Sequence, residues 1–227
     1  MNERIKYYSQ AGEDKFIYEN YIKNKKIKKV YLEMGALDGI KYSNTKFFED
    51  YLGWTGILIE PNPKSYDQLQ VNRPKNILYD NLISDSEEEI SFQYFENIQL
   101  AAVSGVSETL PNSIIDNYYE STDPWLKSQR EQSLKKILKK TRSLDDIIVQ
   151  SVCSEIGFFC LDVEGHELNV LKSFSFDIEV SLFLIESNYN DKIIYDLMTS
   201  HGYKFSCKVS HNNLWLSKKY TTDNNIK

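Results

Sequence analysis

Two acid-containing segments near the start of the chain have the residue types of a cofactor site. Glu33 lies at the end of an apolar run and is followed by Gly35 and Gly39, and the next apolar run, residues 56–59, ends in Glu60. A strand that enters a glycine turn, with an acid closing the next strand, is how a Rossmann-like sheet holds an adenosine-containing cofactor. The glycines let the backbone approach the ligand, and the second acid accepts hydrogen bonds from both ribose hydroxyls.

The spacing of the first segment indicates which cofactor to expect. Its pattern is E-x-G-x-x-x-G rather than G-x-G-x-x-G. This pattern favours S-adenosylmethionine over a dinucleotide, because no pyrophosphate has to be cradled. A nicotinamide-dependent oxidoreductase, the next alternative, needs a phosphate-binding glycine loop that the chain lacks. The spacing therefore predicts a methyltransferase.

A second set of candidate residues follows the apolar run at 157–161. Asp162 and Glu164 point the same way if the strand continues through this segment, and His166 begins the next helix. Methyl transfer to a weakly acidic hydroxyl requires alignment and a base or a metal ion. One arrangement uses His166 as the base, held by a carboxylate. In the structural alternative the two acids only cap the helix, and His166 is an ordinary helix N-terminal residue.

Another arrangement uses a metal ion. Asp162, Glu186 and Asn188 supply oxygen ligands of the kind that Mg²⁺ prefers, and the last two follow a second apolar run at 180–185. The alternative here is that Glu186 is structural. Asp162 thus belongs to both the catalytic and the metal prediction.

The elements needed to position these acids alternate along the chain. Apolar runs predict strands at 30–34, 56–59, 76–79, 89–95, 157–161 and 180–185, and helical periodicity predicts helices at 14–21, 44–51, 64–71 and 192–201, with a closing hairpin from 203–208 and 214–217. Alternation of this kind predicts an α/β protein with a mostly parallel sheet and helices on both faces. Ligands bind beyond the carboxyl ends of such strands, which gathers Glu33, Glu60, Asp162 and Glu186 along one edge.

The segment 127–142 carries seven lysines and arginines and one acid. The lysines fall at helical spacing beside Leu134, Ile137 and Leu138, which predicts a solvated helix face. A nucleic-acid interface is the alternative, and the net charge of −6 argues against it because nonspecific binding is driven by phosphate neutralisation. Its position predicts a lid over the acceptor site, where Tyr118, Tyr119 and Trp125 could stack on sugar rings.

Bulk properties narrow the class of protein further. The 227 residues and 41% hydrophobic content suit one globular domain. Three cysteines at 153, 160 and 207, without zinc spacing, predict small buried hydrophobes in a reducing, cytoplasmic setting. The polar N-terminus lacks the apolar core of a signal peptide, and no apolar run approaches the roughly 20 residues of a membrane span.

Several of these stretches together resemble the FkbM-type S-adenosylmethionine-dependent methyltransferases. The resemblance runs in order from about residue 7 to 217, is poor near 97–140, and rests on the segments 8–14, 33–45, 59–63, 143–146 and 161–167. It implies a class I methyltransferase fold with a mostly parallel seven-stranded sheet, helices on both faces and a C-terminal antiparallel hairpin. It also implies O-methylation of a hydroxyl, commonly on a sugar or secondary metabolite, so the expected partner is a small-molecule or glycan acceptor.

The resemblance also assigns cofactor contacts by position. Asp38 and Asn44 meet the methionine amine and carboxylate, and Asn81 and Ser84 approach the adenine, although a small apolar residue is expected at 81. The implied cofactor set is Gln10, Glu33, Gly35, Asp38, Gly39, Asn44, Glu60, Asn81 and Ser84.

These observations predict one methyltransferase domain at 1–219, with an insertion or lid around 97–140 and a flexible polar tail at 220–227. Two alternatives remain open at this point. One is a non-catalytic binding module that keeps the fold without turnover. The other is a nucleic-acid methyltransferase, which lacks here the Asn/Asp-Pro-Pro-Tyr motif used for base amines. The sequence is compatible with a homodimer.

Overall fold

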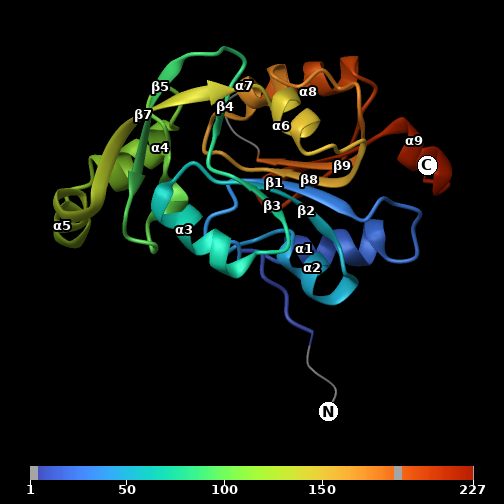
Figure 1. Ribbon diagram of the computed structural model, residues 1–227, viewed down its shortest axis with the longest axis horizontal. Helices are drawn as coiled ribbons and strands as arrows, with labels where there is room; N and C mark the ends of the chain where they lie inside the picture. The colour runs from blue at the N-terminus through green and yellow to red at the C-terminus, as the bar shows by residue number, and fades with distance from the viewer. Residues whose placement is uncertain (1–4, 187–190, 227) are drawn as a thin grey trace.

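A mostly parallel sheet runs through the protein, of which the computed structural model describes residues 5–186 and 191–226 (Figure 1). In these ranges the sheet has seven strands in the order β10-β11-β9-β8-β1-β2-β3. Its strands are β1 (Val30–Met34), β2 (Thr55–Ile59), β3 (Ile77–Tyr79), β8 (Glu155–Leu161), β9 (Glu179–Glu186), β10 (Lys204–Val209) and β11 (Asn212–Leu216). Strand β11 pairs antiparallel with both β9 and β10, while the other pairs are parallel. The expected parallel sheet and closing hairpin are confirmed.

Helices cover both faces of this sheet, because its central strands are apolar on both sides. Leu32, Phe159 and Phe183 pack with the helices on one face, and Tyr31, Phe158 and Leu182 face the opposite layer. The first layer contains α6 (Leu144–Gln150), α7 (Glu167–Lys172) and α8 (Asp191–Ser200), and the second contains α1 (Glu13–Ile17), the π turn η1 (Tyr18–Ile22), α2 (Lys46–Leu52), α3 (Pro63–Asn72) and α9 (Lys218–Asp223) (Figure 1).

The start and end of α2 follow local chemistry. Ser43 Oγ accepts hydrogen bonds from the amides of Thr45 and Lys46, so a polar side chain before the helix satisfies its free donors as expected. The Asn44 side chain does not cap the helix and points elsewhere. Gly53 ends the helix in the left-handed conformation with φ 66°, which glycine adopts without strain.

A second, four-stranded sheet lies beside the carboxyl ends of the large one. Its order is β4-β7-β5-β6, and the polypeptide between β5 and β7 forms short helical pieces beside it. The strands are β4 (Leu82–Ile83), β5 (Glu89–Phe95), β6 (Gly105–Val106) and β7 (Leu134–Arg142), and the helical pieces are η2 (Ala101–Val103), α4 (Asn112–Ile114), η3 (Ile115–Tyr119) and α5 (Pro124–Ser133). The expected insertion around 97–140 therefore lies within a longer stretch of chain that begins at β4.

The prediction of a helix through 127–142 is wrong after Ser133. Residues 134–142 form β7, in which 134–140 pair antiparallel with β5 and 141–142 pair parallel with β4. Ile137 lies opposite Phe92 and packs against the apolar cluster that contains it. The spacing of the apolar side chains suits a helix locally, but pairing with β5 makes this segment a strand in which Leu134 and Ile137 are partly buried and Leu138 is exposed. The lysines of β7 therefore line a strand.

The predicted flexible tail at 220–227 is wrong for the described residues 220–226. Tyr220 lies in α9 with 2% of its surface exposed, and its hydroxyl donates a hydrogen bond to the Tyr21 carbonyl. Ser217 caps the helix by accepting a bond from the Tyr220 amide. The C-terminal helix is therefore part of the second helical layer. No helix in the described ranges has the length and apolar character needed to cross a membrane.

Candidate active site

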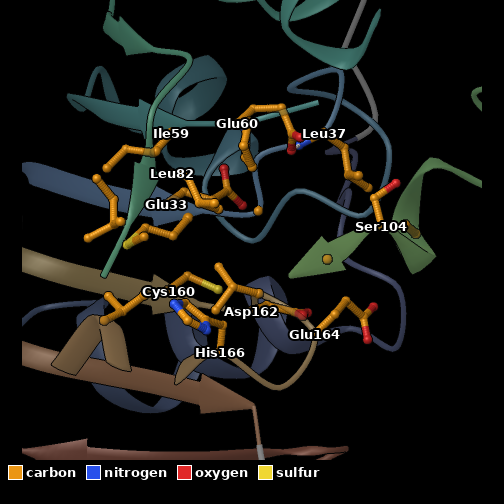
Figure 2. A pocket seen from close by; sticks show the side chains of 18 of the residues that line it. Glu33, Leu37, Ile59, Glu60, Leu82, Ser104, Cys160, Asp162, Glu164 and His166 are labelled. Atoms are coloured by element: carbon orange, nitrogen blue, oxygen red, sulfur yellow. Dashed lines mark hydrogen bonds between the residues drawn. The ribbon is translucent and has the colours of Figure 1, made fainter. Parts of the chain in front are cut away.

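A cavity opens where β1, β2 and β8 end, between the two sheets. It contains about 910 Å³ of empty space, part of which is open solvent at its mouth. Glu60 and Leu37 lie on one side of it, and Asp162 and Glu164 on the other (Figure 2). The predicted site residues that line it are Gln10, Glu33, Gly35, Asn44, Glu60, Asn81, Asp162, Glu164 and His166.

Gly35 and Gly39 shape the turn after β1. Gly35 has φ 75°, and a Cβ on it would lie 1.9 Å from the carbonyl oxygen of Asp162. Gly39 has φ 80°, and a Cβ there would lie 2.5 Å from Arg73 Cγ and 2.6 Å from Leu69 Cδ1. Both positions require glycine for conformation and for space. Gly39 supports the turn from behind and does not line the cavity.

The Glu33 carboxylate is hydrogen-bonded to the segment that follows the turn. Its carboxylate accepts hydrogen bonds from Ser43 Oγ (2.9 Å), the Asn44 amide (2.7 Å) and Thr45 Oγ1 (2.6 Å). Burial raises the pKa of Glu33, and Arg73 opposes that shift. Glu33 thus shapes the cofactor turn as expected, and it does so by anchoring residues 43–45.

Glu60 lies at the end of β2 with 3% of its surface exposed. One carboxylate oxygen accepts from the Leu37 amide and the other from the Asn62 amide, both at 2.8 Å. Burial raises its pKa to about 7, although these two amides favour the charged form. Each oxygen keeps a second lone pair, so the carboxylate can still accept from a pair of ribose hydroxyls.

Asp38 and Ser84 are placed differently from the remaining predicted residues. Asp38 accepts hydrogen bonds from the amides of Ile40 and Lys41, so it holds the turn and does not line the cavity. Ser84 is buried and bonds to His166. Their predicted contacts with methionine and adenine do not match these positions.

Three acids at the ends of β8 and β9 influence one another. Burial raises the pKa of Asp162 to about 7, helped by the nearby Glu167. Burial and the charge of Asp162 raise the pKa of Glu164 to about 9, and burial raises that of Glu186 to about 10. Protons are therefore shared among these carboxyls near neutral pH. Glu164 also has φ 54°, an uncommon conformation for a non-glycine residue that is often found at functional sites.

His166 connects the large sheet with the second one. Its Nε2 lies 3.2 Å from Ser84 Oγ, and its Nδ1 lies 3.2 Å from Thr109 Oγ1. Burial lowers the pKa of His166 to about 4, so the ring is neutral at physiological pH. Because both ring nitrogens are engaged by hydroxyls, neither is free in this conformation to take a proton from an acceptor. The predicted role of His166 as base therefore lacks support from the geometry.

The predicted magnesium ligands fall partly outside the described residues. Asn188 lies in the segment 187–190, which is not described. Within 5–186 and 191–226, no group of three or more His, Cys, Asp or Glu side chains is arranged to hold a metal ion. Glu186 does not line the cavity, and one of its carboxyl oxygens is buried without a hydrogen-bond partner.

Two polar atoms in the cavity wall are buried and lack protein partners. Asn44 donates through Nδ2 to Cys160 Sγ at 3.2 Å, but its Oδ1 is unpaired. Ser104 Oγ, from the second sheet, is also unpaired. Buried polar groups are rarely left without a partner, so these two atoms are candidate hydrogen-bonding positions for a ligand or a water molecule. The sequence pattern identified Asn44 and missed Ser104, which lies in a stretch without a motif.

A mostly parallel sheet with helices on both faces, a glycine turn after β1 and an acid at the end of β2 defines a Rossmann-like α/β protein. The family comparison agrees with that class. Residues 33–205, more than half of the chain, match the model of the methyltransferase FkbM domain. The chain therefore belongs to the FkbM methyltransferase family. No curated protein and no solved structure matches it significantly.

Proposed function

We propose that this protein is an S-adenosylmethionine-dependent O-methyltransferase that acts on a hydroxyl group, most simply that of a sugar. The observation that carries the proposal is the cavity at the strand ends, with Glu60 on one side and the Asp162–Glu164 acids on the other (Figure 2). The first feature suits an adenosine cofactor, and the second suits proton removal from an acceptor. Family membership supports methyl transfer as the reaction.

The residues present fit S-adenosylmethionine. Glu60 would hold the ribose hydroxyls, and Gly35 lines the cavity on the same turn as Leu37, which bonds to Glu60. Asn44 Oδ1 is a buried acceptor without a partner, which suits the ammonium group of the methionine part. Leu82, Ile83 and other apolar side chains of the cavity offer a surface for the adenine ring.

When bound, the sulfonium supplies a methyl group and retains the electron pair of the broken C–S bond as a neutral thioether. The protein has to align the acceptor oxygen and remove its proton. Asp162 is the better placed base, because it lines the cavity and its pKa of about 7 matches the ideal for proton transfer near neutral pH. Glu164, whose pKa is higher, would stay protonated and donate a hydrogen bond to the acceptor.

The composition of the cavity wall favours an uncharged acceptor. No lysine or arginine is among the described residues that line the cavity, whereas four carboxyls are: Glu33, Glu60, Asp162 and Glu164. A phosphate placed at the reacting end would therefore meet acids and no cation. A neutral sugar hydroxyl on a glycan or glycosylated metabolite fits better than the diphosphate of a nucleotide sugar.

Two finer features belong to the same proposal. A magnesium ion would need Asp162 and Glu186 in their charged forms, with Asn188 as a further ligand, and this version fits less well than direct proton removal because Glu186 does not line the cavity. Turnover that survives chelation would exclude that version. The unpaired cysteines 153, 160 and 207 are consistent with a reducing, cytoplasmic setting.

Calorimetry with S-adenosylmethionine, S-adenosylhomocysteine and NAD tests the cofactor. We expect micromolar binding of the first two and no signal for NAD. Failure to bind either sulfur compound would overturn the proposal. Binding without methyl consumption over a wide panel of neutral acceptors would instead support a non-catalytic binding module.

A further inference from the structure

Arg73 is a fully buried arginine that lies behind the cofactor turn. It follows α3, has 0% of its surface exposed, and does not line the cavity. A buried guanidinium is costly unless every donor finds an acceptor. The partners of Arg73 therefore show which part of the protein depends on it.

Part of the guanidinium binds the segment that continues from the glycine turn. Its NH1 group donates to the Gly39 carbonyl at 2.9 Å and to Ser43 Oγ at 3.3 Å. Its NH2 group donates to Thr45 Oγ1 at 3.1 Å. NH1 also lies 3.8 Å from Glu33 Oε2, the carboxylate that anchors the same segment.

The remaining donors bind the body of the protein. Nε donates to Glu49 on α2, and NH2 donates to the Tyr31 hydroxyl on β1 at 2.7 Å. All five N–H groups of the guanidinium are therefore used, three on the turn segment and two on fixed elements. Arg73 connects the turn to the frame of the sheet at several points.

Asn44 lies between two of these contact points. Ser43 and Thr45 both accept hydrogen bonds from Arg73, and the Asn44 amide bonds to Glu33. Asn44 lines the cavity from this fixed position, and its Oδ1 is buried without a protein partner. Glu60, which would hold the ribose, is held by Leu37 and Asn62 instead and does not contact Arg73.

We propose that Arg73 is a positioning residue for the amino-acid half of the cofactor, acting through the segment 39–45, while the nucleoside half is held independently of it. The inference rests on the proposed cofactor. It predicts a selective loss, because only ligands that carry the methionine-derived part meet the segment that Arg73 fixes.

Two ligands separate the halves. S-adenosylhomocysteine has both, whereas 5′-methylthioadenosine has the adenosine and the thioether without the amino-acid part. Lysine keeps the charge at position 73 but presents one nitrogen in place of the planar fork, so Arg73→Lys cannot reach all the contact points. We expect Arg73→Lys to weaken S-adenosylhomocysteine binding about tenfold or more, equivalent to about 1.4 kcal/mol. Binding of 5′-methylthioadenosine should change less than about threefold by the same calorimetric assay.

Asn76→Ala is the matched control. Asn76 accepts from the Tyr31 hydroxyl and from the Gly56 amide, so it belongs to the same buried network without touching segment 39–45. This variant should lower the melting temperature and leave the ratio of the two affinities unchanged. If Arg73→Lys fails to fold, Thr45→Val removes one receiving end of the contact and should show the same selectivity in milder form.

Equal weakening of both ligands, or no weakening of either, would overturn the inference and leave Arg73 a stabilising residue only. A wild-type protein that binds neither ligand would instead overturn the proposed function. Wild-type binding of both ligands, followed by selective loss in Arg73→Lys, is the result that establishes the positioning role.

Discussion

Gly35 and Asp162 lie against each other across the neighbouring strands β1 and β8, so close that a Cβ on Gly35 would lie 1.9 Å from the Asp162 carbonyl oxygen. The pairing of Met34 with Leu161 brings them together, since each residue follows the last paired position of its strand. The absence of a side chain at Gly35 therefore allows the main chain of Asp162, the proposed base, to lie at this position. The contact joins the glycine turn after β1 to the acids that follow β8.

Replacement of Gly35 by alanine should damage the protein more than replacement of Gly53. Gly53 has φ 66° but no atom within 4 Å of its missing Cβ, so Gly53→Ala should cost only the backbone strain of about 1–2 kcal/mol. Gly35→Ala adds a steric clash and should cost about 2–5 kcal/mol in unfolding free energy. Urea unfolding of both variants measures the difference. Equal costs would show that β1 and β8 separate easily.

Glu60→Gln should weaken S-adenosylhomocysteine binding about 10- to 100-fold, because hydrogen bonds to a charged acceptor are worth about 1.5–3 kcal/mol. Titration calorimetry checks the value. Glu89→Gln, at an exposed residue of β5, is the control and should bind like wild type. Unchanged affinity in Glu60→Gln would remove Glu60 from the ribose site.

Asp162→Asn should reduce turnover by about 10²–10⁴-fold while sparing S-adenosylhomocysteine affinity. The pKa of Asp162 is raised to about 7, so the carboxyl is protonated below that pH and cannot accept a proton. The wild-type rate should therefore fall as pH decreases below about 7 and level off above it. Methyl transfer to a neutral sugar acceptor, followed from pH 5.5 to 9, tests this. Near-normal turnover in Asp162→Asn would assign the proton to another group.

Glu186→Gln should stabilise the protein at alkaline pH. Burial, with help from Asp162, raises the pKa of Glu186 from 4.5 to about 10 in the folded state. The folded state then binds more protons than the unfolded state between these values, so this group's contribution is complete below about 4.5 and is lost as pH rises toward 10.

At pH 8.5 the Glu186→Gln variant should therefore exceed wild type in unfolding free energy by at least about 1 kcal/mol, and the difference should shrink toward pH 5. Denaturant unfolding at several pH values gives both curves. Glu131→Gln, at an exposed position, should follow wild type throughout. A constant difference between Glu186→Gln and wild type would show that the carboxyl is not protonated in the fold.

The large sheet could be predicted because its strands are recognisable in the sequence as apolar runs. Continuous apolar runs such as 157–161 and 180–185 indicate strands buried on both faces, and the acids that follow them mark the edge where ligands bind. Glu60 and Asp162 were therefore found from position alone. The second sheet could not be found in this way, because β7 has lysines at helical spacing and becomes a strand only by pairing with β5, about 45 residues away.

The residues that support the site could not be predicted from local sequence patterns either. Arg73 reaches Thr45 and Tyr31 across 28 and 42 residues, and a lone arginine after a helix is not a motif. His166 was predicted as a base from its place in the Asp-Val-Glu-Gly-His-Glu segment. Its two hydroxyl partners, Ser84 and Thr109, come from distant segments that the sequence does not connect with it.

The wall that the second sheet contributes to the cavity has an evolutionary consequence. The proposed ribose and methionine contacts come from residues before about 62, and the proposed adenine surface includes β4, whereas Phe92, Ser104 and Val106 come from the unit that follows β4, residues 89–142. Substitutions in that unit can alter which molecules enter without disturbing the nucleoside contacts. Exchange of this unit between relatives should transfer acceptor preference as an inherited module, while the methyl donor stays the same.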